Sequence, residues 1–160
     1  MNHQGTTGIA SASRAAATPV VGEPRKPGTA TATPCTAAHR RRVLVVDDNP
    51  ILCELMRHAF EPQGHRVRCA ASVQEAVAAL DREPFDAVVC DLHLADGCGL
   101  SVVAHARAQG RHARIPIVVC TVEVGPEVRS DARAAGADAF LTKPARAADL
   151  RGTVERLWLC

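Results

Sequence analysis

Val43-Leu44-Val45-Val46-Asp47-Asp48-Asn49-Pro50 is a wholly apolar run that ends abruptly in two acids and a helix start. Four consecutive aliphatic residues are typical of a strand that helices bury on both faces. Asn49 is a favoured helix cap and proline is favoured at the first helical position, so a helix is predicted from residue 50. The two carboxylates therefore stand where a buried strand passes into a helix.

Short apolar runs and amphipathic stretches continue to alternate from this point to the end of the chain. Further strands are predicted at residues 67–70, 85–90, 115–120 and 139–141. Helices are predicted between and after them, at residues 50–63, from residue 73 onward, and at residues 100–109, 126–135 and 147–159. Five strand–helix repeats with connections of this length imply right-handed crossovers. The predicted fold class is therefore α/β, with a doubly wound, five-stranded parallel sheet covered on both faces.

Residues 1–42 differ in composition from the rest of the chain. They are dominated by Ala, Thr, Gly, Pro, Ser and Arg, and they contain six basic side chains and one acidic side chain. Such a segment cannot bury enough apolar surface to offset its ordering entropy. We expect residues 1–42 to be a disordered basic extension and residues 43–159 to be the folded domain. A charge cluster on a flexible end is usually just solvated, so no specific nucleic-acid or membrane partner is expected.

The cysteines and the hydropathy profile exclude several classes of protein. Cysteines occur at positions 35, 53, 69, 90, 98, 120 and 160, with neither a CxxC motif nor the spacing of a zinc site. We expect them to be small buried hydrophobes in a reducing cytosol rather than redox pairs. No apolar run approaches the ~20 residues that span a membrane, and the N-terminus lacks the apolar core of a signal peptide. The predicted location is the cytoplasm.

Polar side chains are concentrated at the ends of the predicted strands. The first strand ends at Asp47 and Asp48, the third at Asp91, the fourth at Thr121 and the fifth at Lys143. Open α/β sheets bind ligands at this edge. Three carboxylates there repel by ~1 kcal/mol per pair at ~4 Å in water, a cost that a hard cation such as Mg²⁺ removes. A lysine and a hydroxyl suit phosphate oxygens, and a carboxylate among them can accept a phosphoryl group.

Four motifs at these strand ends occur in a characteristic order. They are Val45-Val46-Asp47-Asp48-Asn49-Pro50, Cys90-Asp91-Leu92, Cys120-Thr121 and Gly136-Ala137-Asp138-Ala139-Phe140-Leu141-Thr142-Lys143-Pro144. Together they resemble the receiver domain of bacterial two-component response regulators, and the resemblance covers residues 43–159. It implies the flavodoxin-like (βα)5 fold. Because no effector sequence follows residue 160, a stand-alone receiver of the chemotaxis type is expected.

The resemblance also implies a role for each site residue. Asp91 would accept a phosphoryl group from a histidine kinase or a histidine phosphotransfer protein. The implied Mg²⁺ ligands are Asp47, Asp48, Asp91 and the backbone carbonyl of His93. Thr121 and Lys143 would contact the phosphoryl group, and Phe140 would turn inward on activation. The chain would not be an enzyme in its own right. It would signal to a downstream protein target, or dimerise on phosphorylation, through the surface around Phe140 and the last two helices.

Four residues depart from the family pattern and keep alternatives open. Ala95 replaces a usual proline, Ala145 a usual bulky residue, and Val122 a usual alanine or glycine, while His93 occupies a variable position. One alternative is a degenerate receiver that acts only as a protein-binding module. The other is a metal-dependent phosphohydrolase of the haloacid-dehalogenase kind. That enzyme would need a second aspartate two residues after the nucleophile, where this chain has His93.

Overall fold

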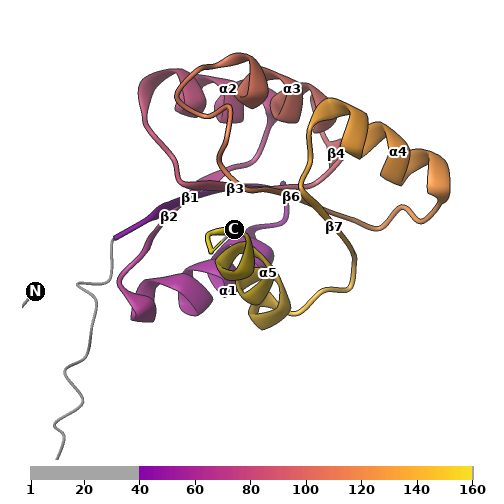
Figure 1. The fold of residues 1–160 in the computed structure, drawn as a ribbon. Helices are drawn as coiled ribbons and strands as arrows, with labels where there is room; N and C mark the ends of the chain where they lie inside the picture. The colour runs from indigo at the N-terminus through magenta and orange to yellow at the C-terminus, as the bar shows by residue number, and fades with distance from the viewer. Residues whose placement is uncertain (1–39, 160) are drawn as a thin grey trace, which may run out of the picture. The chain divides into compact units, whose positions relative to one another are not determined.

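Five parallel strands form the sheet at the centre of residues 40–159, the part of the chain that the computed structural model describes (Figure 1). These strands are β1 (Arg42–Val46), β2 (Arg66–Ala70), β3 (Ala87–Cys90), β6 (Ile117–Thr121) and β7 (Ala139–Thr142). Their spatial order is β2-β1-β3-β6-β7, so β2 and β7 are the two edges. A short antiparallel hairpin, β4 (His93–Leu94) with β5 (Gly97–Cys98), follows β3. The predicted doubly wound α/β fold is confirmed.

The helices cover both faces of this sheet, as the apolar strand sequences require. They are α1 (Pro50–Phe60), the 3-10 turn η1 (Glu61–Gln63), α2 (Val73–Arg82), α3 (Leu100–Ala108), α4 (Pro126–Ala135) and α5 (Ala147–Leu157). Figure 1 shows α2, α3 and α4 on one face and α1 and α5 on the other. Alternate residues of β1 enter the two cores: Leu44 and Val46 face α2 and α3, whereas Val43 and Val45 face α1 and α5.

The first strand begins at Arg42, one residue before the predicted domain boundary. The backbone N–H of Arg42 donates to Asp86 Oδ2 at 2.7 Å, and the N–H of Asp86 donates to the Arg42 carbonyl at 2.7 Å. The Arg42 guanidinium also pairs with Glu83. Arg42 therefore belongs to the folded domain. Of the extension predicted to be disordered, residues 1–39 lie outside the described residues.

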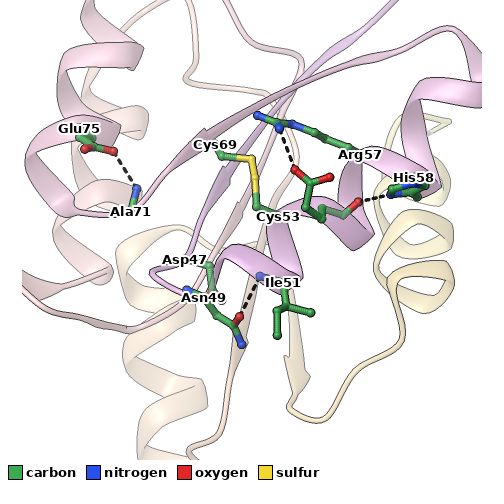
Figure 2. The surroundings of a disulfide bond; sticks show 10 residues. Asp47, Asn49, Ile51, Cys53, Arg57, His58, Cys69, Ala71 and Glu75 are labelled. Carbon is green, nitrogen blue, oxygen red and sulfur yellow. Dashed lines mark hydrogen bonds and ion pairs between the residues drawn. A yellow bond between two sulfur atoms is a disulfide. The ribbon is translucent and has the colours of Figure 1, made fainter.

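The cysteines depart from their predicted role in two places. Cys53 of α1 and Cys69 of β2 form a disulfide across a Cα–Cα distance of 6.1 Å (Figure 2). Cys98 is exposed, whereas Cys90 and Cys120 are buried in the two cores as expected. Sequence spacing could not reveal the disulfide, because only the packing of α1 on β2 brings its two residues together.

Gly99 lets the loop after β3 return against the strand end. A Cβ at this position would overlap the carbonyl oxygen of Asp91 and lie 2.9 Å from Cys90 Sγ. The N–H of Gly99 donates to the Leu92 carbonyl at 2.9 Å, which fixes the close approach. The loop that carries Asp91 therefore depends on a residue without a side chain.

We predict that Gly99→Ala lowers the free energy of unfolding by about 3 kcal/mol, because the methyl group enters only if the backbone moves. Gly152→Ala is the matched control: Gly152 lies inside α5 with nothing within 4 Å of an added Cβ. That change should raise the free energy of unfolding by roughly 0.5–1 kcal/mol. Urea unfolding followed by circular dichroism measures both, and a Gly99→Ala chain as stable as the parent would contradict the close approach.

Candidate functional site

The strand register places the predicted site residues side by side at one edge of the sheet. Val46 is the partner of Cys90, so Asp47 and Asp91, which follow them, lie next to each other. Thr121 is the partner of Thr142, which precedes Lys143. This edge is the carboxyl end of all five strands, and the strand order reverses between β1 and β3. It is therefore the place where an open α/β sheet binds its ligand.

Lys143 joins the two buried carboxylates. Its Nζ lies 2.5 Å from Asp47 Oδ2 and 2.6 Å from Asp91 Oδ2, and the two aspartates are only 5% and 6% exposed. Backbone N–H groups bind the other oxygens. Asp47 Oδ1 accepts from Asn49 at 2.9 Å, and Asp91 Oδ1 accepts from Leu92 at 2.6 Å. Both carboxylates are thus fixed in orientation before any ligand arrives.

The net charge of the site favours a bound cation. Burial lowers the pKa of Lys143, but its hydrogen bonds to Asp47 and Asp91 and their charges outweigh burial and raise this pKa above its usual value. Lys143 is therefore an ammonium at neutral pH. Asp48, the third acid, is exposed at the same strand end. Three carboxylates and one ammonium leave two formal negative charges, which a divalent cation would neutralise.

The predicted metal ligands are only partly assembled. Within residues 40–159, no three His, Cys, Asp or Glu side chains converge as a metal-binding group. The Lys143 ammonium lies between Asp47 and Asp91, and Asp48 is exposed. His93 was expected to contribute its backbone carbonyl, and its N–H lies 3.3 Å from Asp91 Oδ1. The donors are all carboxylate or carbonyl oxygens, which fits a hard cation such as Mg²⁺.

Thr121 is buried at the end of β6, where it connects two loops. Its Oγ1 accepts a hydrogen bond from the N–H of Glu123 at 3.4 Å. Its carbonyl accepts from the N–H of Lys143 at 2.7 Å, which ties the end of β6 to the residue that follows β7. A shift of Thr121 would therefore move both the loop after β6 and the backbone of Lys143.

A histidine–carboxylate contact that sequence reasoning missed connects the loops after β3 and β6. His93 Nε2 lies 2.8 Å from Glu123 Oε1, and both side chains are partly exposed. His93 was considered for its backbone carbonyl and as a variable position near the site, but not as a partner of Glu123. No motif signals the pair, because its members lie on separate loops that meet only in the fold. The contact joins the Asp91 loop to the Thr121 loop.

An apolar groove runs beside Lys143, along the start of α1. It has a volume of about 380 Å³, and its apolar lining includes Ile51, Leu52, Leu55, Val122, Pro144 and Ala145. Ile51, Leu55 and Val122 are 67%, 49% and 62% exposed, a high exposure for large aliphatic side chains. An exposed apolar surface of this kind marks an interaction site. The sequence predicted the aliphatic spacing of α1 but not that part of it faces outward.

A doubly wound sheet with three strand-end acids, a hydroxyl and a lysine at one edge defines a class of signalling domains that handle phosphoryl groups. Residues 43–155 match the response regulator receiver domain, and the chain belongs to this family. The predicted resemblance is thereby confirmed, and the chain is part of two-component signalling. None of the helices within residues 40–159 is long and apolar enough to cross a membrane.

Relatives and solved structures agree with this assignment. The chain is 37% identical over 115 residues to the response regulator protein PilR of Pseudomonas aeruginosa, covering 72% of this chain but 25% of PilR. It is similar to the chemotaxis response regulator CheY4 of Vibrio cholerae, with 30% identity, a TM-score of 0.69, and 74% and 98% of the two chains covered. The receiver domain of sensor histidine kinase PA1611 from P. aeruginosa gives 28% identity and a TM-score of 0.67, with 76% and 99% covered. That structure has a magnesium ion coordinated in its active site cleft. The chain thus spans about a quarter of PilR and nearly all of the two solved domains.

We predict that Lys143→Met lowers the free energy of unfolding at pH 7 by about 3 kcal/mol, because it leaves two buried carboxylates without a counter-charge. The loss comes from two buried negative charges that repel each other without the ammonium between them. Added protons neutralise carboxylates, so the loss should shrink as the pH falls from 7 toward about 4. Urea unfolding across this pH range measures the effect.

Lys143→Arg keeps the positive charge and is the control for this prediction. It should lose less stability than Lys143→Met at pH 7. Millimolar Mg²⁺ should recover part of the Lys143→Met loss, since a bound cation supplies the missing charge. A Lys143→Met loss that is the same at every pH would show that the lysine contributes by packing alone.

Proposed function

We propose that this receiver domain is a phosphoacceptor. Asp91 takes a phosphoryl group from a histidine kinase or a histidine phosphotransfer protein, and the domain then signals through protein contacts. The observation that carries the proposal is the ammonium of Lys143, shared by two buried carboxylates at the ligand-binding edge of the sheet. Such a group is already charged, partly buried and in place to meet an incoming phosphoryl group, so little reorganisation accompanies the reaction.

The proposed chemistry is an in-line transfer to Asp91. One carboxylate oxygen of Asp91 forms a bond to phosphorus while the P–N bond of the donor's phosphohistidine breaks, and the imidazole leaves with the bonding electron pair. The Lys143 ammonium then pairs with the oxygens of the transferred phosphoryl group. Thr121 donates its hydroxyl hydrogen to another of these oxygens. The hydrogen bonds from Leu92 and His93 to Asp91 Oδ1 hold the nucleophile in position.

The proposed cofactor is Mg²⁺. Asp47, Asp48, Asp91 and the His93 carbonyl would hold the ion, which when bound would neutralise the carboxylates and bind phosphoryl oxygens. Support comes from the two unbalanced negative charges of the site and from its all-oxygen donors. The proposed role is that of a signalling protein rather than an enzyme. The proposed location is the cytoplasm, where ATP-dependent kinases supply such groups.

The apolar groove beside Lys143 is the proposed docking surface for the phosphodonor. The groove places the exposed side chains of Ile51, Leu55 and Val122 next to Lys143, whose ammonium contacts Asp91. A donor histidine on an apolar helix surface could reach Asp91 while its flanking side chains cover these residues. Apolar burial would supply affinity, and the charged groups of the site would supply chemistry.

The proposed output surface is formed by α4, β7 and α5. Phe140 on β7 is half-buried, and the guanidinium of Arg129 on α4 lies 4.9 Å from the centre of its ring. Phe140 lies on β7, which ends directly before Lys143. β7 pairs in the sheet with β6, which ends at Thr121. Movement of Thr121 and Lys143 toward a phosphoryl group would therefore reach Phe140 and change the surface that a downstream protein, or a second copy of the domain, contacts.

We predict that Asp91 is the single phosphorylated residue. Incubation with Mg²⁺ and acetyl phosphate should add one phosphoryl group to the intact mass, and Asp91→Asn should abolish the increase. Asp96→Asn is the matched control, because Asp96 is an acid on the same loop whose carboxylate caps α2 instead. An adduct that persists in Asp91→Asn would refute the assignment. A parent chain that never gains mass would favour the degenerate, binding-only receiver.

We predict that Val122 slows phosphoryl exchange. Its branched side chain has few rotamers and lines the groove beside Lys143, so it restricts the approach of the donor and of water. Val122→Ala should speed labelling by acetyl phosphate and shorten the lifetime of the phosphorylated form, each by up to about tenfold, which corresponds to ~1.4 kcal/mol. Time-resolved intact mass measures both rates.

Val124→Ala is the control for steric gating, because Val124 is 71% exposed on the same loop and does not line the groove. Its labelling and decay rates should match those of the parent. If Val122→Ala also matched the parent in both rates, the gate would have to lie in the His93–Glu123 pair instead.

A further inference from the structure

The Cys53–Cys69 disulfide joins α1 to β2 (Figure 2) and shares a pocket with Asp47 and Asp48, two acids of the candidate site. Cys53 is the fourth residue of α1, and Cys69 is the fourth residue of β2. Their Cα–Cα distance of 6.1 Å lies within the usual range for a disulfide. The covalent bond therefore links the start of a helix to the edge of the sheet.

Both sides of this link lead to Asp47. On the β2 side, Cys69 precedes Ala70, whose carbonyl accepts from the N–H of Asp47 at 3.0 Å. On the α1 side, Asp47 Oδ1 accepts from the N–H of Asn49 at 2.9 Å, and Asn49 caps α1. Figure 2 shows Asp47 and Asn49 on the turn that precedes the helix bearing Cys53. The disulfide thus closes a ring of contacts around the first acid of the site.

Small reagents can reach the pair through a pocket of about 290 Å³. This pocket is lined by both cysteines together with Asp47, Asp48 and other residues of α1 and the β2–α2 turn. Cys69 is half-buried and Cys53 is 8% exposed, so Cys69 is the more exposed residue of the pair. Two other buried cysteines, Cys90 and Cys120, are less reactive at neutral pH. Burial raises the pKa of the Cys120 thiol to about 11 and that of Cys90 further, so neither forms the reactive thiolate at neutral pH.

We propose that Cys53 and Cys69 form a reversible thiol–disulfide pair whose oxidation state regulates the cation and phosphoacceptor site beside it. The thiol–disulfide exchange is inferred from the pocket and from the disulfide itself. The regulation of the site rests on the proposed function. The proposed location is the cytoplasm, and cytosolic disulfides are usually transient and catalytic or redox-sensing.

The exchange takes place with a low-molecular-weight disulfide such as oxidised glutathione. The Cys69 thiolate attacks one sulfur of the small disulfide, forms a mixed disulfide and releases one thiolate. The Cys53 thiolate then attacks Cys69 Sγ, forms the protein disulfide and releases the second thiolate. Two electrons pass from the cysteines to the small disulfide, and the two S–H protons end on the two released thiols. Reduced glutathione drives the same steps in reverse.

The direction of the regulation follows from pre-organisation. With the bond closed, the first turn of α1 and the Asp47–Asn49 turn are held against β2. With the bond open, only hydrogen bonds and packing hold them, so binding a cation must also order the turn. The oxidised form should therefore bind Mg²⁺ more tightly, and Asp91 should be labelled faster than in the reduced form by roughly threefold or more.

The first experiment tests the chemistry of the pair. A chain with Cys35→Ser, Cys98→Ser and Cys160→Ser retains the pair and the two buried thiols. It is equilibrated in glutathione buffers, quenched with acid, alkylated and measured by intact mass and peptide mapping. Cys53 and Cys69 should become alkylated together, at a midpoint set by the square of the reduced glutathione concentration over the oxidised. The reduced form should stay folded, with a thermal midpoint lower by about 10 °C.

Two outcomes of this first experiment would overturn the proposal. A pair that opens only when urea unfolds the chain is a structural disulfide. A pair that stays reduced at every glutathione ratio is not joined under these conditions. Joint alkylation of a folded chain supports the proposal.

The second experiment tests the coupling to the site. Acetyl phosphate labelling of Asp91 and calorimetric Mg²⁺ affinity are compared between the oxidised and reduced forms. The additional double substitution Cys53→Ala/Cys69→Ala is the control, and its rate and affinity should not respond to glutathione. Equal rates and equal affinities in the two forms would overturn the regulatory role. If neither form is labelled, the proposed function fails, and the Mg²⁺ affinity alone decides: a difference between the forms supports coupling and equality refutes it.

Discussion

One ammonium shared by two buried carboxylates is the constraint around which this domain is arranged. Lys143 comes from the end of the fifth strand of the sheet, while Asp47 and Asp91 come from the ends of two central strands. Each charge would be costly in a dry sheet edge without the others, so three distant segments of sequence must end at the same place. The parallel register, the helix cap at Asn49 and the close approach of Gly99 all serve that convergence.

The sequence predicted the central strands and the polar residues at their ends, because two signals reinforce each other: an apolar run, and the polar residue that ends it. β3 is apolar throughout, and β1 is apolar after Arg42, since helices cover both faces of these strands. A polar residue can follow only where the sheet ends. Asp47, Asp91, Thr121 and Lys143 were found by that rule, and the structure brings them to one edge. Asp48 was found in the same way, but its side chain is exposed and the predicted cation ligands are only partly assembled.

Features that depend on the packing of separate segments could not be predicted. Helical spacing gave the aliphatic residues of α1 but not which of them face outward, and Ile51 and Leu55 are exposed. The His93–Glu123 pair and the Cys53–Cys69 disulfide join elements whose distance is set by the tertiary fold. In each case residue type and spacing carry no information about the partner, because the partner lies on an element that is remote in sequence.

The two edges of the sheet also differ in how they meet other molecules. On β2, the exposed side chains of Arg66 and Arg68 project from the outermost strand, and a charged edge opposes the addition of a further strand. On β7, every residue is partly buried and none is charged. Among the described residues, the β2 edge therefore carries charges that oppose sheet extension, whereas β7, the strand that carries Phe140, has none, so self-association by strand pairing is favoured at β7 over β2.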